Sequence, residues 1–368
     1  MEPTATLPVS LDQLLDRLAR FEPTHLPVIS LYLNLQADQH GKDNYQPFVR
    51  KELPARVAGY PAGSEARESL DKDVARIEQY LANEVAPSAN GLALFACAGL
   101  EFFEAVSLEA PMPSHRLSVA PEPHLYPLEL LLDQHPPHAV VLADAHSARI
   151  FVFAQGAAVR NATVEAREKI KRSSAGGWSQ MRYQRHMDEI QAEHARELVS
   201  VLDRMVRDEG IAHVIIAGDD INTALIRGEM GKELTAKLVD VLKLETRTPE
   251  QDVMRAAAEA LRRHDANTDL EAVEQVIGDY QAGGLGVVGR DDVLAALERG
   301  QVSELLLTAT AAGGAELLAD QLVAKARQTS ATMRFIEDPA LLEAAGGVAA
   351  ALRYRLDAAA TAPPGKPG

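Results

Sequence analysis

The sequence predicts an α/β protein built from three α/β domains. Short β-type runs alternate with helical, 3.6-periodic segments along the chain, which is typical of layered α/β architectures. At 368 residues the chain exceeds the size at which a single hydrophobic core stops growing. Proline- and glycine-rich breaks place the domains at residues 1–133, 134–248 and 249–356, and the remaining residues 357–368 are expected to form a disordered tail.

The first domain is expected to begin with a helix and to contain a small sheet. Ser10 caps a helix whose leucines recur at helical spacing, and residues 28–35 alternate as a strand. Two helical stretches follow at about 44–58 and 64–85, and residues 91–108 read as a β-hairpin with its turn at Gly99. No motif in this domain indicates its role.

The second domain is expected to be a mixed sheet with a long helix. Residues 139–143, 149–153 and 157–165 form three strands of a meander. A helix then runs from about His186 to Asp208, because apolar side chains recur along one face from Met187 onward. A buried strand at 214–218 follows, and a helix starts after Asp219–Asp220.

The third domain is expected to be an α/β/α sandwich. A helix opens at Pro249, and a second begins at Asp291–Asp292. Strands are predicted at 304–308 and 332–336, with a helix between them that ends near Gln328. This strand–helix–strand order favours a sheet with helices on both faces.

Bulk composition narrows the class of protein. No apolar run approaches the length of a membrane span, and the N-terminus lacks the basic and apolar regions of a signal peptide, so a cytoplasmic protein without a membrane partner is expected. The single cysteine, Cys97, excludes an internal disulfide and a cysteine-based zinc cluster, and its apolar neighbours predict a buried thiol. The net charge of −16 argues against general coating of nucleic acid.

A basic loop between the second domain's meander and its long helix departs from this acidic background. Between Arg167 and Arg185 the chain carries six basic side chains and one acidic, a local charge of +5. At its centre lie two adjacent glycines, the only tryptophan and a glutamine, in the order Gly176-Gly177-Trp178-Ser179-Gln180. Adjacent glycines let a partner's backbone come close, and concentrated positive charge indicates an anionic partner. A surface loop with a basic rim is the simpler alternative, but loops of about twenty residues are usually functional or disordered.

These residues carry a family resemblance. Gly176, Gly177 and Gln180, in a basic loop between a meander and a long helix, resemble the Gly-Gly-Gln peptide-release loop of the archaeo-eukaryotic class-I release factors. The form with two residues before the glutamine is similar to a bacterial branch of that superfamily, akin to the ribosome-quality-control factor that cuts stalled chains from tRNA. The third domain, at residues 287–293 and 346–354, resembles the family's C-terminal domain, a fold related to RNA-binding ribosomal proteins. The resemblance covers roughly residues 134–356.

The resemblance implies a codon-independent peptidyl-tRNA hydrolase that acts on stalled ribosomes or 50S subunits. Gly176, Gly177 and Gln180 would be catalytic by placing a water at the ester, a positioning and electrostatic task in a site made largely of RNA. The ribosome and peptidyl-tRNA are the expected partners, and a translational GTPase is a further candidate. RNA contacts are expected from the loop's basic residues and its tryptophan, which is expected to stack on a base: Arg167, Lys169, Lys171, Arg172, Trp178, Arg182 and Arg185.

Two other functions stay open. A non-catalytic factor that occupies the ribosomal A site, in rescue by subunit splitting or in hibernation, would use the same surfaces without hydrolysis. The acidic body of the chain and a first domain without a recognisable motif keep this alternative open, whereas a pure occupant has no need of Gly176, Gly177 and Gln180 together. A soluble interaction protein without RNA is favoured only by the net charge of −16, and the +5 loop counts against it.

The remaining motifs have structural explanations, and we expect no cofactor and no metal. Gly284 to Gly289 matches Gly-x-Gly-x-x-Gly but follows a predicted helix rather than a strand, so the dinucleotide-binding context is missing. Asp219 at a strand end is explained by helix capping. His186 and His194 are eight residues apart, twice the spacing of a zinc pair on a helix, so helix packing or exposure is expected.

Overall fold

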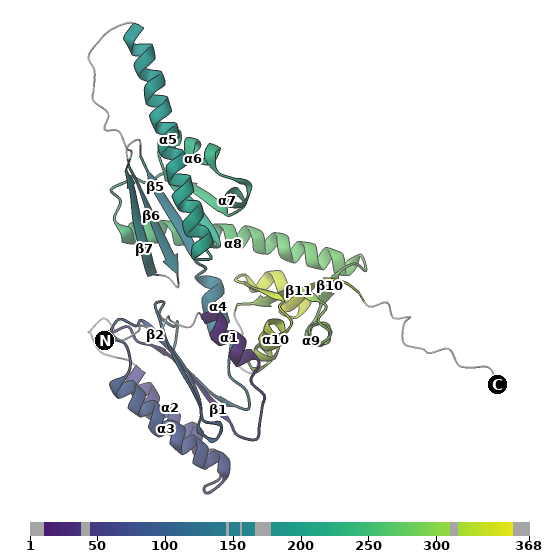
Figure 1. The fold of residues 1–368 in the computed structure, drawn as a ribbon. Helices are drawn as coiled ribbons and strands as arrows, with labels where there is room; N and C mark the ends of the chain where they lie inside the picture. The colour runs from purple at the N-terminus through teal and green to yellow at the C-terminus, as the bar shows by residue number, and fades with distance from the viewer. Residues whose placement is uncertain are drawn as a thin grey trace, which may run out of the picture. The chain divides into compact units, whose positions relative to one another are not determined.

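A computed structural model describes residues 11–37, 45–144, 147–154, 157–165, 178–309 and 316–355. Their contacts divide the chain into two compact units, one formed by residues 1–133 together with 266–368 and the other by residues 134–265. Both are mixed α/β structures, so the predicted fold class is confirmed (Figure 1). Among the described residues, no helix combines the length and the hydrophobicity that crossing a bilayer requires.

The first sheet of the discontinuous unit is antiparallel, with strand order β3-β2-β1-β4. Helices α2 and α3 bury one of its faces, and α1 and α4 contribute to the core on the other. The predicted helices and hairpin are confirmed, with a single 3-10 turn, η1 (Ala98–Leu100), around Gly99. The bounds are α1 Leu11–Ala19, β1 Val28–Asn34, α2 Tyr45–Val57, α3 Glu65–Asn83, β2 Gly91–Cys97, β3 Phe102–Leu108, β4 Arg116–Ala120 and α4 Tyr126–Gln134.

The second sheet of this unit has the order β10-β13-β11-β12 and lies between two helical layers. Helices α9 and α10 pack on one face, whereas α8 and η3 pack on the other, which confirms the predicted α/β/α sandwich. Strands β10 and β13 and the turn η3 were not predicted. The bounds are α8 Glu250–Gln281, β10 Gly286–Val288, α9 Arg290–Glu298, β11 Val302–Thr308, α10 Glu316–Gln328, β12 Thr332–Ile336, η3 Pro339–Ala345 and β13 Val348–Leu352.

The glycines of the Gly-x-Gly-x-x-Gly stretch serve packing. A Cβ on Gly286 would lie 2.2 Å from the carbonyl oxygen of Val276 and 2.5 Å from the amide nitrogen of Tyr280, so only glycine lets β10 pass this close to α8. A helix precedes the motif, as the sequence predicted, and the dinucleotide-binding arrangement is absent from this described segment.

The first and last parts of the chain share one hydrophobic core. Side chains of α1, α4 and β2 pack with those of α9, α10 and β11 in a single buried cluster. Buried polar contacts join the same parts: Asp320 accepts a hydrogen bond from the Tyr126 backbone at 2.9 Å and contacts the His124 ring. Arg327 is bound by Glu129 and, at 3.0 and 3.2 Å, by Asp12 and Asp16. The division into three domains at residues 133 and 248 stays a prediction. The contacts place the predicted first domain and most of the predicted third domain in one unit.

The continuous unit, residues 134–265, is a five-stranded mixed sheet with the order β7-β6-β5-β8-β9. Strands β5, β6 and β7 form the predicted meander, while β8 and β9 run parallel to β5. Helix α5 packs on one face, and the first half of α8 buries the other. The bounds are β5 His138–Ala143, β6 Ser147–Ala154, β7 Ala157–Glu165, α5 Trp178–Asp208, β8 His213–Gly218, α6 Asp220–Glu229, α7 Lys232–Ala236 and β9 Leu238–Leu242.

Candidate functional site

The predicted loop leaves the sheet at the edge where the parallel strands end. Ala143 at the end of β5 pairs with Gly218 at the end of β8 and with Ala148 on β6. Ser147 pairs in turn with Glu165, the last residue of β7. The chain therefore enters residues 166–177 from the carboxyl edge of the sheet, where ligands of open α/β sheets commonly bind.

Close packing at this edge depends on one glycine. Gly218 has φ of +150°, and a Cβ there would lie 2.3 Å from the carbonyl oxygen of Ala143. Any other residue would force β5 and β8 apart where the two strands end. The edge is thereby held at fixed spacing beside the start of the predicted loop.

The polar side chains of this edge bind one another. Asp219 caps α6 by accepting hydrogen bonds from the backbone N–H groups of Ile221 and Asn222, at 3.0 and 2.9 Å. The Asn222 backbone donor is the main reason that the pKa of Asp219 lies below its usual value. The capping role predicted for Asp219 is confirmed.

Asp144 links the loop after β5 to the segment after β9. It accepts from the Ser147 backbone N–H at 2.8 Å and from the Thr246 hydroxyl at 2.8 Å. Arg149 donates to the carbonyl oxygen of Thr246 at 3.0 Å, and its guanidinium lies 4.6 Å from the centre of the Phe151 ring. This network was not predicted from the sequence, although a polar residue directly after a buried strand is its signal.

Asp144, Asp219 and Thr246 line a shallow hollow. Asp220 and Lys243, which form an ion pair at 3.0 Å, line it as well. The carboxylates of the three aspartates are already engaged as a cap, a turn acceptor and an ion-pair partner, and Glu245, which also lines the hollow, is exposed. Within the described ranges, no group of three or more His, Cys, Asp or Glu side chains is arranged to hold a metal ion. The arrangement thus explains how the edge is built, and it assigns no chemistry to the hollow.

Helix α5 begins earlier than the sequence analysis predicted. Its first residue is Trp178, eight residues before His186, so the prediction of a loop through Arg185 is wrong and the connection is shorter. The prediction failed because apolar periodicity starts only at Met187. Residues 178–186 lack that periodicity, but they contain Gln, Met and Arg, which favour helix, and no glycine or proline. A helix of 31 residues spans about 46 Å.

Among the side chains of α5 that the structure describes, those of its C-terminal half join the domain core. Its buried apolar residues run from Ala195 to Val206, and His194, 7% exposed, lies at the start of this buried face. Figure 1 shows the N-terminal half of the helix continuing past the end of the sheet. His194 is a packing residue, as predicted, whereas the side chain of His186 lies outside the described residues.

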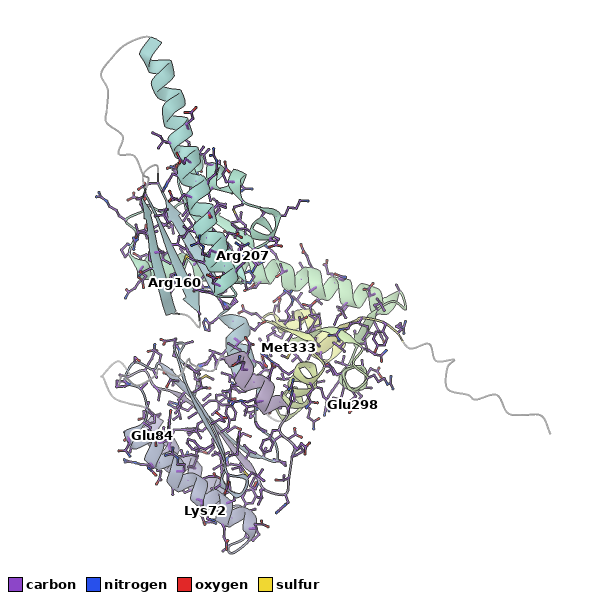
Figure 2. The ribbon with its side chains drawn as sticks, in the orientation of Figure 1. Lys72, Glu84, Arg160, Arg207, Glu298 and Met333 are labelled. Carbon is purple, nitrogen blue, oxygen red and sulfur yellow. The ribbon has the colours of Figure 1, made fainter. Side chains whose placement is uncertain are left out.

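Several arginines of the described part of β7 and α5 are paired with carboxylates. Arg160 on β7 contacts Glu209, and Arg207 pairs with Asp203 at 2.7 Å, one turn earlier on α5 (Figure 2). Arg196 lies 3.4 Å from Glu229. The described part of the unit thus balances these charges internally, in contrast to the unbalanced +5 of the sequence between Arg167 and Arg185.

The structure locates the predicted site residues only in part. Arg167, Lys169, Lys171, Arg172, Gly176 and Gly177 lie outside the described residues. The backbones of Trp178, Gln180, Arg182 and Arg185 lie in the first turns of α5, and their side chains are likewise outside the description. Gln180 is the third residue of the helix, so its backbone N–H is among the four at a helix start that find no acceptor within the helix.

Comparison with known proteins bears on this unit. Residues 123–262 match the sequence model of bacterial archaeo-eukaryotic release factor family 10. Over these residues the chain is similar to the release factor-like superfamily. The match spans the whole second unit up to residue 262 and includes β7, α5 and the segment between them. The resemblance predicted from the Gly-Gly-x-x-Gln segment is confirmed at the level of the superfamily.

Solved structures give distant likenesses. An archaeal translation termination factor, aRF1, is 20% identical, with 94% of this chain and 97% of that chain covered and a TM-score of 0.28. Dom34 of S. cerevisiae, a translation termination-like factor interacting with Hbs1, is 9% identical over 77% and 94% of the chains, with a TM-score of 0.44. Archaeal Pelota, solved bound to the ribosome with ABCE1, is 13% identical over 94% and 95%, with a TM-score of 0.42. The sequence matches no curated protein.

Proposed function

We propose that this protein is a codon-independent peptidyl-tRNA hydrolase that releases nascent chains from stalled ribosomes or 50S subunits. The observation that carries the proposal is the basic Gly176-Gly177-Trp178-Ser179-Gln180 segment at the start of α5, within the unit that matches a release factor family. The ribosome, through its large-subunit RNA, and peptidyl-tRNA are the partners in this proposal. A translational GTPase that delivers the protein is a further candidate.

The reaction is hydrolysis of the ester between the peptide and the 3′ ribose oxygen of tRNA. A water oxygen attacks the ester carbonyl carbon, the bond from that carbon to the ribose oxygen breaks, and the proton from water ends on the ribose oxygen. The peptide leaves as a carboxylic acid. The protein's part is to place the water and to stabilise the negative charge that develops on the carbonyl oxygen.

The start of α5 supplies groups suited to this task. The backbone N–H groups of residues 178–181 have no acceptor within the helix, and a helix N-terminus favours negative charge. Gly176 and Gly177 let the main chain come close to the ester, and the Gln180 side chain orients the water. The basic residues of the segment bind phosphates, and Trp178 stacks on an exposed base.

Single-turnover hydrolysis of peptidyl-tRNA on stalled 70S or 50S complexes tests the proposal. Release by the wild type and its loss in Gln180→Ala and Gly177→Ala is the expected result. Gln184→Ala is the matched control, because it removes the same side chain one helical turn later and is expected to keep full activity. Equal release by Gln180→Ala and wild type would contradict the catalytic assignment.

One observation favours a second candidate, a non-catalytic factor that occupies the ribosomal A site for subunit splitting or hibernation. Trp178 and Ser179 separate the glycines from Gln180. Trp178, Ser179 and Gln180 lie in a helix rather than in an open loop. Under this alternative the segment anchors the protein to RNA. Ribosome binding without release, in the same assay combined with co-sedimentation, would select it.

A further inference from the structure

A second concentration of cations lies in the other unit, at one end of the sheet β10-β13-β11-β12. Strand β13 ends where β10 and β11 begin, because Ala351 pairs with Gly286 and Leu352 pairs with Val302. Helix α8 ends just before β10, and α9 ends just before β11. Their last residues therefore meet the segment that follows β13. The exposed side chains gathered at this end, which we name the Arg–Tyr end, are Tyr280, Leu285, Arg299, Arg353, Tyr354 and Arg355.

Backbone hydrogen bonds fix this end. The Leu352 N–H donates to the carbonyl oxygen of Leu285, and the Arg353 N–H donates to that of Gln301, both at 2.7 Å. The side-chain amide of Gln301, itself buried, donates to the carbonyl oxygen of Tyr354 at 3.2 Å. The segment after β13 is thus held on both sides, so the surface requires little ordering before it binds a partner.

The arginines of this end keep their charge available. Arg353 and Arg355 donate to backbone carbonyl oxygens, of Thr329 at 3.3 Å and of Gly283, and no ion pair joins Arg299, Arg353 or Arg355 to another described residue. Two other arginines of the same unit are neutralised. Arg334 lies 3.0 Å from Glu304, and three carboxylates surround Arg327.

A carboxylate does lie nearby. Glu298 precedes Arg299 at the end of α9 (Figure 2) and is exposed. Asp279, half-buried and directly before Tyr280, lies at this end as well. Three arginines against these two carboxylates leave the end positive by one charge, in a chain whose net charge is −16. A local reversal of sign of this kind indicates an anionic partner.

The two tyrosines indicate which anion. Tyr280 and Tyr354 are 49% and 45% exposed, whereas every other described phenylalanine and tyrosine side chain is buried or half-buried. The Tyr354 hydroxyl donates to the carbonyl oxygen of Arg299 at 3.4 Å, so its polar tip is turned to the protein and its ring is left to the solvent. Exposed rings beside arginines form the stacking and phosphate-binding surface of proteins that hold unpaired nucleotides.

We infer that the Arg–Tyr end binds single-stranded RNA, with Arg299, Arg353 and Arg355 on phosphates and Tyr280 and Tyr354 stacked on bases. This is an RNA contact separate from the Gly-Gly-x-x-Gln segment, on the other unit of the chain. It holds whether or not the protein hydrolyses peptidyl-tRNA. An acidic protein segment would use the arginines but has no bases to stack on the tyrosines.

Fluorescence anisotropy with a labelled 12-nucleotide oligoadenylate tests the inference. The full chain is used in a background that removes the RNA contacts of the other basic segment, so that this segment does not bind the probe. The residues changed to alanine in this background are Arg167, Lys169, Lys171, Arg172, Trp178, Arg182 and Arg185. In this background Tyr354→Ala is expected to weaken binding at least about fivefold, and Tyr354→Phe, which keeps the ring, by less than about twofold. Arg299→Ala is expected to reduce the slope of log K against log salt by about 0.7.

The matched control is Arg56→Ala, an exposed arginine on α2 without an ion pair to another described residue. It is expected to leave oligoadenylate binding unchanged. Unaltered binding in both Tyr354→Ala and Arg299→Ala, or an equal loss in Arg56→Ala, would overturn the inference. Binding of a labelled 12-residue polyglutamate peptide in place of oligoadenylate would also overturn it and would assign the surface to an acidic protein.

Discussion

Asp73 is a buried carboxyl group whose ionisation opposes folding. It lies on α3 and is 2% exposed, facing the turn that follows β2. The Ala98 backbone donates a hydrogen bond to it, but its Oδ2 atom has no partner among the described residues. Burial is the main cause that raises the pKa of Asp73 from 3.8 to about 7. The same carboxylate contributes, after burial itself, to raising the pKa of the neighbouring Cys97 thiol.

The raised pKa predicts how stability depends on pH. Between pH 3.8 and about 7 the folded state holds a proton at Asp73 that the unfolded state has lost, so this contribution to stability falls as the pH rises. One pKa unit corresponds to about 1.4 kcal/mol, and the whole shift therefore to about 4 kcal/mol. The contribution is fully present below pH 3.8 and is gone above about pH 8.

Replacing Asp73 by asparagine removes the titration while keeping the shape of the side chain. We expect the unfolding free energy of the wild type, relative to Asp73→Asn, to fall by about 4 kcal/mol between pH 4 and pH 8. Urea titrations read by pulsed hydrogen exchange on peptides of α3 would measure it in the unit concerned, since a chain of two units need not unfold in one step.

Asp71→Asn is the control on the same helix. Asp71 is exposed and lies 2.9 Å from Arg67, a surface pair worth at most about 1 kcal/mol. The difference in unfolding free energy between Asp71→Asn and the wild type is expected to change little between pH 4 and pH 8. A flat difference for Asp73→Asn as well would refute the reasoning, because it would show that Asp73 titrates alike in the folded and unfolded states.

Three further substitutions test contacts of the fold, each by urea unfolding at pH 7. Gly218→Ala places a Cβ against the carbonyl oxygen of Ala143 and is expected to cost more than about 2 kcal/mol, whereas a cost near zero would mean that β5 and β8 separate freely. Arg327→Ala leaves Glu129 buried without its cation and is expected to cost about 3–5 kcal/mol, with partial recovery in the double variant that adds Glu129→Gln; no recovery would show that the loss is not electrostatic. Asp219→Ala removes the cap of α6 and is expected to cost about 1 kcal/mol, and no loss would contradict the capping role.

The sequence predicted those elements whose burial follows a simple period. The hairpin of β2 and β3, helices α2 and α3 and the meander of β5 to β7 all show one buried face or a continuous apolar run. The first turns of α5 were missed for the same reason, because the helix there extends beyond the sheet and has no apolar period. Strand β13, Val-Ala-Ala-Ala-Leu, lies between β10 and β11, and its alanines carry little β-propensity.

Contacts between distant parts of the chain leave no local signal. His124 and Asp320 are 196 residues apart, and Arg327 and Asp12 are 315 apart, so nothing in either neighbourhood predicts that they meet. For the candidate site, residue types and spacing were enough to predict the superfamily and the cap at Asp219. The Asp144–Thr246 contact depends on the pairing of β5, β8 and β9, which local patterns do not specify.

The discontinuous unit, formed by residues 1–133 and 266–368, has a consequence for the protein's own biosynthesis. Residues 134–265 emerge from a ribosome and can fold while the chain is still growing, since domains generally fold as units during synthesis. The first 133 residues cannot complete their packing until later, because Leu11, Leu14 and their neighbours share a core with α10, which is translated near the end. A nascent chain that stops before Asp320 and Arg327 therefore keeps an apolar surface of its first part uncovered, as a target for chaperones and proteases.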